Sequence, residues 1–281
     1  MASKDNYVFT RDVLDNARLN LMHSLWARSS GYVIHPKIPT DNAEIYIADI
    51  GAGTGAWLCD VSERLPKTAQ LYGLDISFDA MPPPEILPPN VTLRNWDVRT
   101  TVPEDLVGAF DIIQIRFFIF VLLRNEVSSV VGKLVEMLKP GGYLQWVDSD
   151  NHSIRFEKTK PENATEHLNK LMRLLESQST QLKPDWVPDL PGFFSENGLV
   201  DVEADRQDTP PHLAFMMHKS GLIMHELIAR KTQNEEMAKQ LRELLPLAVD
   251  ETRKGAYITT DRHTIIGHEC MYLDTDLHRA S

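Results

Sequence analysis

A glycine-rich stretch in the first quarter of the chain carries the clearest chemical signal. Asp49-Ile50-Gly51-Ala52-Gly53-Thr54-Gly55 follows a short apolar run and precedes a stretch of helical character, residues 56–64. Glycines let a backbone turn sharply and approach a ligand with no Cβ in the way. The start of the following helix offers free N–H groups. The pattern therefore predicts a ligand-binding loop between a strand and a helix.

This loop, taken alone, fits two classes of ligand. Gly51, Gly53 and Ala56 satisfy the GxGxxG/A pattern of dinucleotide-binding enzymes. However, Gly55 comes only two residues after Gly53, and Asp49 lies two residues before Gly51. A carboxylate at that place suits a ligand with an ammonium group and suits a pyrophosphate badly. We favour the ammonium-bearing ligand and keep NAD as the alternative.

Two more acids end the next predicted strands. Asp75 lies 24 residues after Gly51, where a carboxylate can accept hydrogen bonds from both ribose hydroxyls, a feature that NAD enzymes share. Asp97, in Asn95-Trp96-Asp97-Val98, can accept from the exocyclic amine of adenine while Trp96 or Val98 covers the base. In the alternative interpretation, Asp97 caps a helix and Trp96 is a core residue.

A parallel sheet would bring these residues together. Apolar runs predict strands at 45–50, 71–76, 91–96, 110–115 and 143–147, and helices at 56–64 and 126–138. Strands that alternate with helices imply right-handed crossovers and parallel pairing. Open sheets of this kind bind ligands at the carboxyl ends of their strands. The loop and the two acids should therefore share one edge of the sheet.

The flanking segments are predicted to be mostly helical. A helix at 10–27 has Thr10 as its N-cap and an apolar stripe made of Val13, Leu14, Ala17, Leu21 and Leu25. Later segments predict helices at 163–176, 190–197, 212–230 and 234–248, and strands at 199–204 and 263–268. We interpret residues 1–281 as one domain. Its parts are an N-terminal cap (1–40), a cofactor-binding core (41–148) and a substrate-side half with helical lid insertions (149–281).

Composition narrows the choice of partner. The chain has 29 Lys and Arg against 40 Asp and Glu, a net charge of −11, whereas proteins that grip a polyphosphate backbone usually show the opposite balance. No stretch reaches the roughly 18 apolar residues of a membrane helix, and the N-terminus lacks the apolar region of a signal peptide. Cys59 and Cys270 form no zinc or CxxC spacing. We expect a cytoplasmic protein with a small-molecule substrate and no nucleic-acid or membrane partner, and its oligomeric state stays open.

Taken together, these motifs resemble those of class I S-adenosylmethionine-dependent methyltransferases. The stretches DIGAGTG, GLDIS, NWDVRT, FDIIQIR and LKPGGYLQWVDSD occur in the order and spacing of that family. More narrowly, the chain resembles the fungal secondary-metabolism branch, which includes regulators of the LaeA type and small-molecule methyltransferases. Tyr7-Val8-Phe9, Arg18-Leu19, His23 and the stretch 31–36 also look like that branch. The similarity covers nearly the whole chain and is weakest after about residue 205.

The resemblance implies an α/β fold, a Rossmann-like seven-stranded methyltransferase sheet with helical cap and lid insertions. It also implies S-adenosylmethionine as cofactor and S-adenosylhomocysteine as product. Carried over by position, the cofactor-binding residues are Arg18, Asp49, Gly51, Ala52, Gly53, Gly55, Asp75, Ile76, Trp96, Asp97, Val98 and Arg116. Arg116 would offer its carbonyl to the methionine amine, and Arg18 is a candidate for the methionine carboxylate. Met22 departs from the branch, which often has Gln before the helix histidine.

Catalysis of methyl transfer needs little acid–base chemistry, because positioning and desolvation around an activated sulfonium can supply much of the rate. His23 and Asp148 are candidate general bases, as are His152 and His218, although each alone also suits a structural role. An apolar acceptor pocket is expected from Tyr7, Phe9, Met22, Trp26, Phe117, Met216 and Met217. Asp148, Asp150 and His152 could form a metal cluster, but strand four ends without an acid, so we predict no metal.

The sequence thus predicts methyl transfer to a small natural product. Within the fungal branch, the similarity favours a thiol of a gliotoxin-like dithiol as acceptor, with oxygen or nitrogen acceptors as alternatives. A LaeA-like regulator and an NAD-dependent oxidoreductase are the rival functions. The acidic balance and the lack of a basic tail disfavour the regulator, and the placement of Asp49 disfavours the oxidoreductase.

Overall fold

The sheet that the motifs require is present in the computed structural model, which describes residues 7–177 and 182–270. Its strand order is β3-β2-β1-β4-β5-β7-β6. The strands are β1 (Tyr46–Ile50), β2 (Gln70–Asp75), β3 (Val91–Asn95), β4 (Phe110–Arg116), β5 (Leu138–Lys158), β6 (Leu199–Gln207) and β7 (Ala256–Glu269). β1 to β5 pair in parallel, and β7 runs antiparallel between β5 and β6. The prediction of a seven-stranded Rossmann-like sheet is confirmed.

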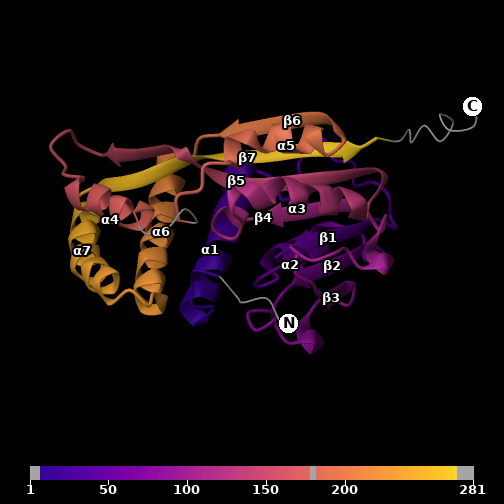
Figure 1. Cartoon of the computed structure of the whole chain (residues 1–281), viewed down its shortest axis with the longest axis horizontal. Helices are drawn as coiled ribbons and strands as arrows, with labels where there is room; N and C mark the ends of the chain where they lie inside the picture. Colours follow the sequence, from indigo (N-terminus) through magenta and orange to yellow (C-terminus); the bar gives the residue numbers. More distant parts are fainter. Residues whose placement is uncertain (1–6, 178–181, 271–281) are drawn as a thin grey trace, which may run out of the picture.

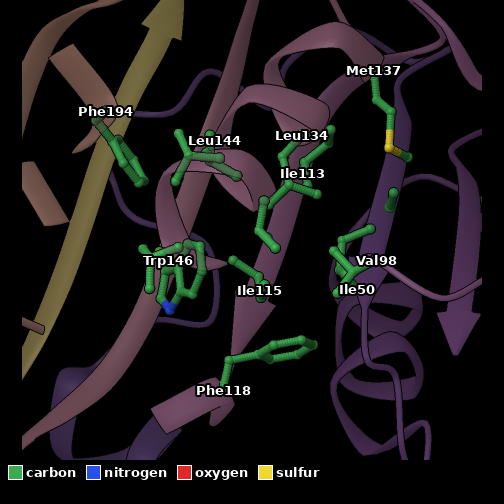
Figure 2. Packing of buried hydrophobic residues seen from close by; sticks show 14 of the residues in the cluster. Ile50, Val98, Ile113, Ile115, Phe118, Leu134, Met137, Leu144, Trp146 and Phe194 are labelled. Carbon is green, nitrogen blue, oxygen red and sulfur yellow. The ribbon is translucent and has the colours of Figure 1, made fainter. Parts of the chain in front are cut away.

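Helices cover both faces of this sheet (Figure 1). They are α1 (Val13–Ser30), α2 (Ala56–Arg64), α3 (Arg124–Met137), α4 (Glu166–Glu176), α5 (Leu190–Glu196), α6 (Pro211–Lys231) and α7 (Glu235–Arg253). On one face, α3 and α5 bury residues such as Ile113, Ile115 and Trp146, and Figure 2 shows this packing with Phe118 beside the end of β4. On the other face, α2 packs on Ile47 and Ile112. Alternate residues of β4 thus serve opposite layers.

The strand order reverses between β1 and β4, because the chain crosses from β3 at one edge to β4 on the far side of β1. A crevice opens at such a switch point, outside the carboxyl ends of the two strands. The glycine-rich loop leaves β1 there, and Arg116 ends β4 there. The fold therefore places the two segments of greatest chemical interest side by side.

The first helix differs from its prediction in its ends and in its buried face. Asp12, and not Thr10, is the N-cap, since its Oδ1 accepts from the backbone N of Leu14 and Asp15 at 2.9 and 3.0 Å. The predicted apolar stripe is wrong, because Val13 is 83% and Leu21 43% exposed. The buried residues of α1 are Asp15, Arg18, His23, Leu25 and Trp26. A mostly polar face therefore points inward.

β5 and β7 are much longer than the predicted strands 143–147 and 263–268. They continue past the sheet as an antiparallel ribbon that ends where Lys158 pairs with Ala256. Beyond the sheet, α4, α6 and α7 pack under this ribbon, at the end of the molecule away from β3 (Figure 1). Leu168, Leu171, Leu227 and Leu241 form their shared core, together with Phe9 from the N-terminal segment. The predicted lid helices therefore form one unit with the ribbon.

Candidate active site

The glycine-rich loop owes its shape to three left-handed residues. Gly51, Gly53 and Gly55 have φ values of 68°, 55° and 71°, which strain any residue with a Cβ. A Cβ on Gly51 would lie 2.5 Å from the Phe118 ring, and one on Gly55 would overlap the sulfur of Met81. On Gly53 it would meet nothing closer than the Gly51 carbonyl at 3.8 Å. Two of the glycines therefore permit close packing, while Gly53 leaves open space for a ligand.

A cavity of about 390 Å³ opens beside this loop, at the carboxyl ends of β1 to β4 and against α1. Most of the expected cofactor-binding residues line it. They are Asp49, Gly51, Ala52, Gly53, Asp75, Ile76, Trp96, Asp97, Val98 and Arg116. Arg18 and Gly55 are absent from its wall. The structure thus brings together residues that the sequence separates by almost seventy positions.

Asp75 and Asp97 are fixed by backbone N–H groups. Asp75 Oδ2 accepts from Gly53 N at 2.8 Å, and its Oδ1 accepts from Ser77 N at 3.1 Å. Asp97 Oδ1 accepts from Arg99 N at 3.0 Å. Burial raises the pKa of Asp75, while the hydrogen bond from Gly53 lowers it. Both side chains are therefore held in one orientation at the edge of the cavity.

Asp49 has a different environment. Its side chain is 6% exposed, and among the described residues it forms neither a hydrogen bond nor an ion pair within 4 Å. Burial raises its pKa to about 7, although the positive charge of Arg116 acts in the opposite direction. A buried carboxylate without a partner is unfavourable in water-poor surroundings. A cation in the cavity would therefore find a binding group ready for it.

The polar face of α1 closes the cavity. Tyr7, Arg11, Asp15, Asn16, Leu19 and His23 line it from this side. Arg11, Asp15, Asn16 and Leu19 were not predicted as site residues. The four-residue spacing of Asp15, Leu19 and His23 along one helix face was available as a signal, but the apolar-stripe interpretation turned that face outward.

Arg18, the expected ligand of the methionine carboxylate, is engaged elsewhere. Its Nε and Nη2 both donate to Asp15 Oδ1, at 3.0 and 2.6 Å, and its guanidinium lies over the Phe9 ring at 4.7 Å. Both members of the Arg18–Asp15 pair are buried. Arg18 therefore positions Asp15 and links α1 to Phe9 and the second hydrophobic core.

His23 lines the cavity but offers no free lone pair. Its Nδ1 lies 3.1 Å from Arg116 Nη2, and its Nε2 lies 3.0 Å from Asp60 Oδ2. A guanidinium can only donate, so Nδ1 accepts and Nε2 carries the proton that is donated to Asp60. Burial and the charge of Arg116 lower the pKa of His23 to about 4. The side chain is thus a neutral bridge between Asp60 and Arg116.

Asp148, the second expected base, lies behind the cavity wall. Its Oδ2 accepts from Phe118 N at 2.9 Å and from Trp146 Nε1 at 3.1 Å. Burial raises its pKa to about 7. These bonds hold the turn that begins at Phe118 against β5, which is a structural role.

The other histidine candidates are also placed away from the cavity. His218 accepts from Ile258 N at 3.2 Å through Nδ1, so its Nε2 donates to Thr252 at 2.8 Å, which ties α6 to α7 and β7. His152 is on the surface, with a side chain 63% exposed. Asp150 accepts from the backbone N of His152. Within residues 7–177 and 182–270, no three His, Cys, Asp or Glu side chains gather as metal ligands would.

The expected apolar pocket is only partly brought together. Tyr7 and Phe117 line the cavity. Trp26 is buried with its ring 4.9 Å from that of Phe117, and Phe9 is buried in the second core. Met22, Met216 and Met217 do not line the cavity, and Met216 is 47% exposed. The methionines of α6 therefore lie on faces that do not meet the cavity.

Known proteins similar to this chain bear on its identity. A family model described as a methyltransferase domain matches residues 48–144, the part that carries the loop and the three acids. The N-methyltransferase tcpN of Claviceps purpurea is 26% identical over 200 residues, which cover 70% of each chain. The secondary metabolism regulator LAE1 of Hypocrea atroviridis is 27% identical over 149 residues, 52% of this chain and 41% of that protein.

The fold agrees with these similarities. In a solved structure, a phosphoethanolamine N-methyltransferase of Haemonchus contortus was captured with S-adenosylhomocysteine. It superimposes with a TM-score of 0.52 at 12% identity, over 95% of this chain and 59% of that one. No helix among the described residues is long and apolar enough to cross a membrane.

The cavity residues fit S-adenosylmethionine as the cofactor. Open space at Gly53, a carboxylate at the end of each of two neighbouring strands and the unpartnered Asp49 suit a nucleoside joined to a cationic amino acid. The sequence-based prediction of this cofactor is confirmed by the family match. Residues 48–144 carry a methyltransferase domain, and the chain is similar to an N-methyltransferase and to a secondary metabolism regulator of fungi; these findings support a class I S-adenosylmethionine-dependent methyltransferase.

Proposed function

We propose that this enzyme methylates a nitrogen atom of a small fungal natural product, with the cofactor lying across the ends of β1, β2 and β3. One observation carries the cofactor assignment: Asp49, Asp75 and Asp97, which end or follow three successive strands, line a single cavity. In this assignment Asp49 binds the amino group, Asp75 the ribose hydroxyls, and Asp97 with Val98 the adenine. S-adenosylmethionine supplies a methyl group already activated by its sulfonium.

The chain's own residues position and desolvate the reactants. The inner face of α1, with Asp15 and His23, and Tyr7 from the segment before it cover the cavity and limit the entry of water. His23 has both ring nitrogens engaged, and Asp148 lies outside the cavity wall. His152 and His218 also lie outside the cavity, so none of the four candidate bases is available to take a proton from an acceptor. This arrangement supports an acceptor whose lone pair is free without a strong base.

Nitrogen is the first proposal for the acceptor atom because the relative tcpN is named as an N-methyltransferase. The thiol of a gliotoxin-like dithiol, which the sequence analysis favours, is the second candidate. A thiol has a pKa near 8.5 and is partly ionised at neutral pH, so it reacts without a strong base. A phenol, with a pKa near 10, fits this cavity less well.

An acceptor screen tests the choice of atom. The purified protein is incubated with S-adenosylmethionine and with matched panels of secondary amines and amides, dithiols and phenols, and products are identified by mass spectrometry. We expect a mass gain of one methyl group in the nitrogen panel. Products only in the thiol panel would support the second candidate, products only in the phenol panel would contradict both, and no product in any panel despite cofactor binding would support the regulator.

Cofactor binding is tested separately. Asp75→Ala should weaken S-adenosylhomocysteine binding by about 2–4 kcal/mol, the scale of lost hydrogen bonds to a charged group, as measured by calorimetry. Asp75→Asn keeps one acceptor oxygen for Gly53 N and should lose less. Asp79→Ala, in the same loop but outside the cavity wall, is the matched control and should bind normally. Unchanged affinity in Asp75→Ala would remove this residue from the proposed site.

A further inference from the structure

We propose that Arg116, held in place by His23 and Asp60, binds the carboxylate of the cofactor's methionine part. This inference rests on the proposed cofactor position. It assigns to Arg116 the binding of the methionine carboxylate, for which the family resemblance suggested Arg18. It also assigns to the Arg116 side chain a task beyond that expected of its backbone carbonyl.

Arg116 ends β4 beside the glycine-rich loop, and its side chain reaches the same cavity as Asp49. The two opposite charges influence each other, yet among the described residues no ion pair within 4.0 Å joins Arg116 to any carboxylate. A guanidinium carries five N–H donors, and its contact with His23 accounts for one nitrogen. Arg116 is partly exposed, and a charge that is partly withdrawn from water is normally paired. The remaining donors are therefore available to an anion in the cavity.

A zwitterion satisfies both unpaired groups at once. Asp49 and Arg116 leave β1 and β4, which are neighbours in the sheet, with Asp49 in register with Gln114. An amino acid moiety lying between them would direct its ammonium group to Asp49 and its carboxylate to Arg116. The methionine part of the cofactor has this charge pattern. In this proposal, the ligand's amino acid moiety occupies the space between the side chains of Asp49 and Arg116.

Two direct contacts, one of them supported by Asp60, fix the guanidinium before any ligand arrives. His23 Nδ1 accepts from Nη2 at 3.1 Å, and the charge lies over the Phe117 ring at 4.7 Å. Asp60 in turn orients His23 at 3.0 Å and accepts from Arg64 Nε at 2.5 Å. Phe117 has a φ of 63°, a strained value for a residue with a bulky side chain. Strain of this kind persists where surrounding contacts determine the geometry, and here it brings the ring under the guanidinium.

The other arginines near the cavity are engaged. Arg18 donates twice to Asp15 and does not line the cavity. Arg99 donates through Nε to Glu126 at 2.9 Å and through Nη2 to the Val121 carbonyl. Arg11 lies over the Tyr7 ring at 4.6 Å, on the side of Asp75. Arg116 is thus the cation best placed beside Asp49.

Three ligands separate the contributions. S-adenosylhomocysteine carries both the ammonium and the carboxylate, its decarboxylated analogue keeps only the ammonium, and 5′-methylthioadenosine has neither. Calorimetry should show that the wild type binds S-adenosylhomocysteine about ten- to hundred-fold more tightly than the decarboxylated analogue, the range of a charged hydrogen bond. Arg116→Met should remove most of this difference and leave 5′-methylthioadenosine binding unchanged. Asp49→Asn should weaken both amine-bearing ligands.

The positioning residues have a test of their own. His23→Phe should reduce the preference for the carboxylate-bearing ligand, and the double variant with Arg116→Met should be no worse than Arg116→Met alone. Arg116→Lys keeps the charge and serves if Arg116→Met fails to fold. Arg124→Met, which removes a surface pair with Asp189, is the matched control and should behave as wild type.

The outcomes are distinct. If the wild type binds none of the three ligands, the proposed function fails. If it binds S-adenosylhomocysteine but Arg116→Met and Arg116→Lys lose affinity equally for the two amine-bearing ligands, the inference about the carboxylate is wrong while the proposed function stands. Additive effects of His23→Phe and Arg116→Met would show that His23 acts independently of the guanidinium.

Discussion

The carboxyl group of Asp49 should link cofactor binding to pH. Burial raises its pKa to about 7, so in the free enzyme this group is mostly protonated at pH 6. An ammonium group binds the ionised form, and binding at pH 6 must therefore release a proton. Affinity for S-adenosylhomocysteine should rise about tenfold between pH 6 and pH 8 and then level off, since the raised pKa lies between the two values.

Calorimetry in buffers of different ionisation enthalpy measures this proton release directly. Asp49→Asn should abolish the release and flatten the pH dependence. Asp148→Asn is the matched control, because burial raises the pKa of Asp148 to about 7 as well, yet Asp148 itself does not line the cavity. Equal proton release in wild type and Asp49→Asn would contradict the role given to Asp49.

At the scale of single elements, the glycines of the loop should divide into two kinds. Gly53→Ala leaves the added methyl group in open space, so the loss of stability should be limited to about 1–2 kcal/mol for the left-handed backbone. The same methyl group would occupy space meant for the ligand, and S-adenosylhomocysteine binding should be strongly reduced. Gly51→Ala forces the Phe118 ring to move and should lower the melting temperature further.

Thermal unfolding and calorimetry on the two variants separate stability from binding. The expected pattern is a folded Gly53→Ala protein that has lost its ligand and a Gly51→Ala protein with the lower melting temperature. The same melting temperature for both would contradict the assignment of Gly51 to packing.

The elements differ in how far they could be predicted from the sequence. The loop after β1 and the acids Asp75 and Asp97 were predictable from short local patterns. A few neighbouring residues determine both their chemistry and their positions at the ends of strands. The inner face of α1 was not predictable in this way. Asp15 and His23 are buried because they face a polar cavity whose other walls come from distant segments. Apolar periodicity identifies a buried face only when the face meets a hydrophobic core.

Strand pairing between distant parts of the chain also could not be predicted from local sequence patterns. The extension of β5 past Asp150 crosses a register shift, and its partner β7 lies about a hundred residues further along the chain. No local pattern marks such a ribbon, whose strands are stabilised by each other and by the helices beneath them. Met216 and Met217 lie outside the cavity for the same reason, because the orientation of α6 depends on the ribbon and on α7.

For the whole molecule, the position of α1 between the sheet and α6 predicts which segments ligand binding will stabilise (Figure 1). Hydrogen exchange followed by mass spectrometry should show S-adenosylhomocysteine slowing exchange in α1 and in the loop after β1, which both line the cavity. In α7, which rests on α4 and α6, exchange should change little. NAD should protect none of these segments, and equal protection throughout would point to one cooperative unit instead.

All five tryptophans of the chain are buried, which gives the protein a built-in optical signal. Trp57 and Trp96 line the cavity, Trp26 packs on Phe117 at its edge, and Trp146 and Trp186 lie against each other with ring centroids 5.6 Å apart. Emission from the free enzyme should therefore be blue-shifted, and an adenine arriving beside Trp96 should quench part of it. A fluorescence titration would follow binding without a label, and Trp96→Phe would identify the ring that reports the nucleobase.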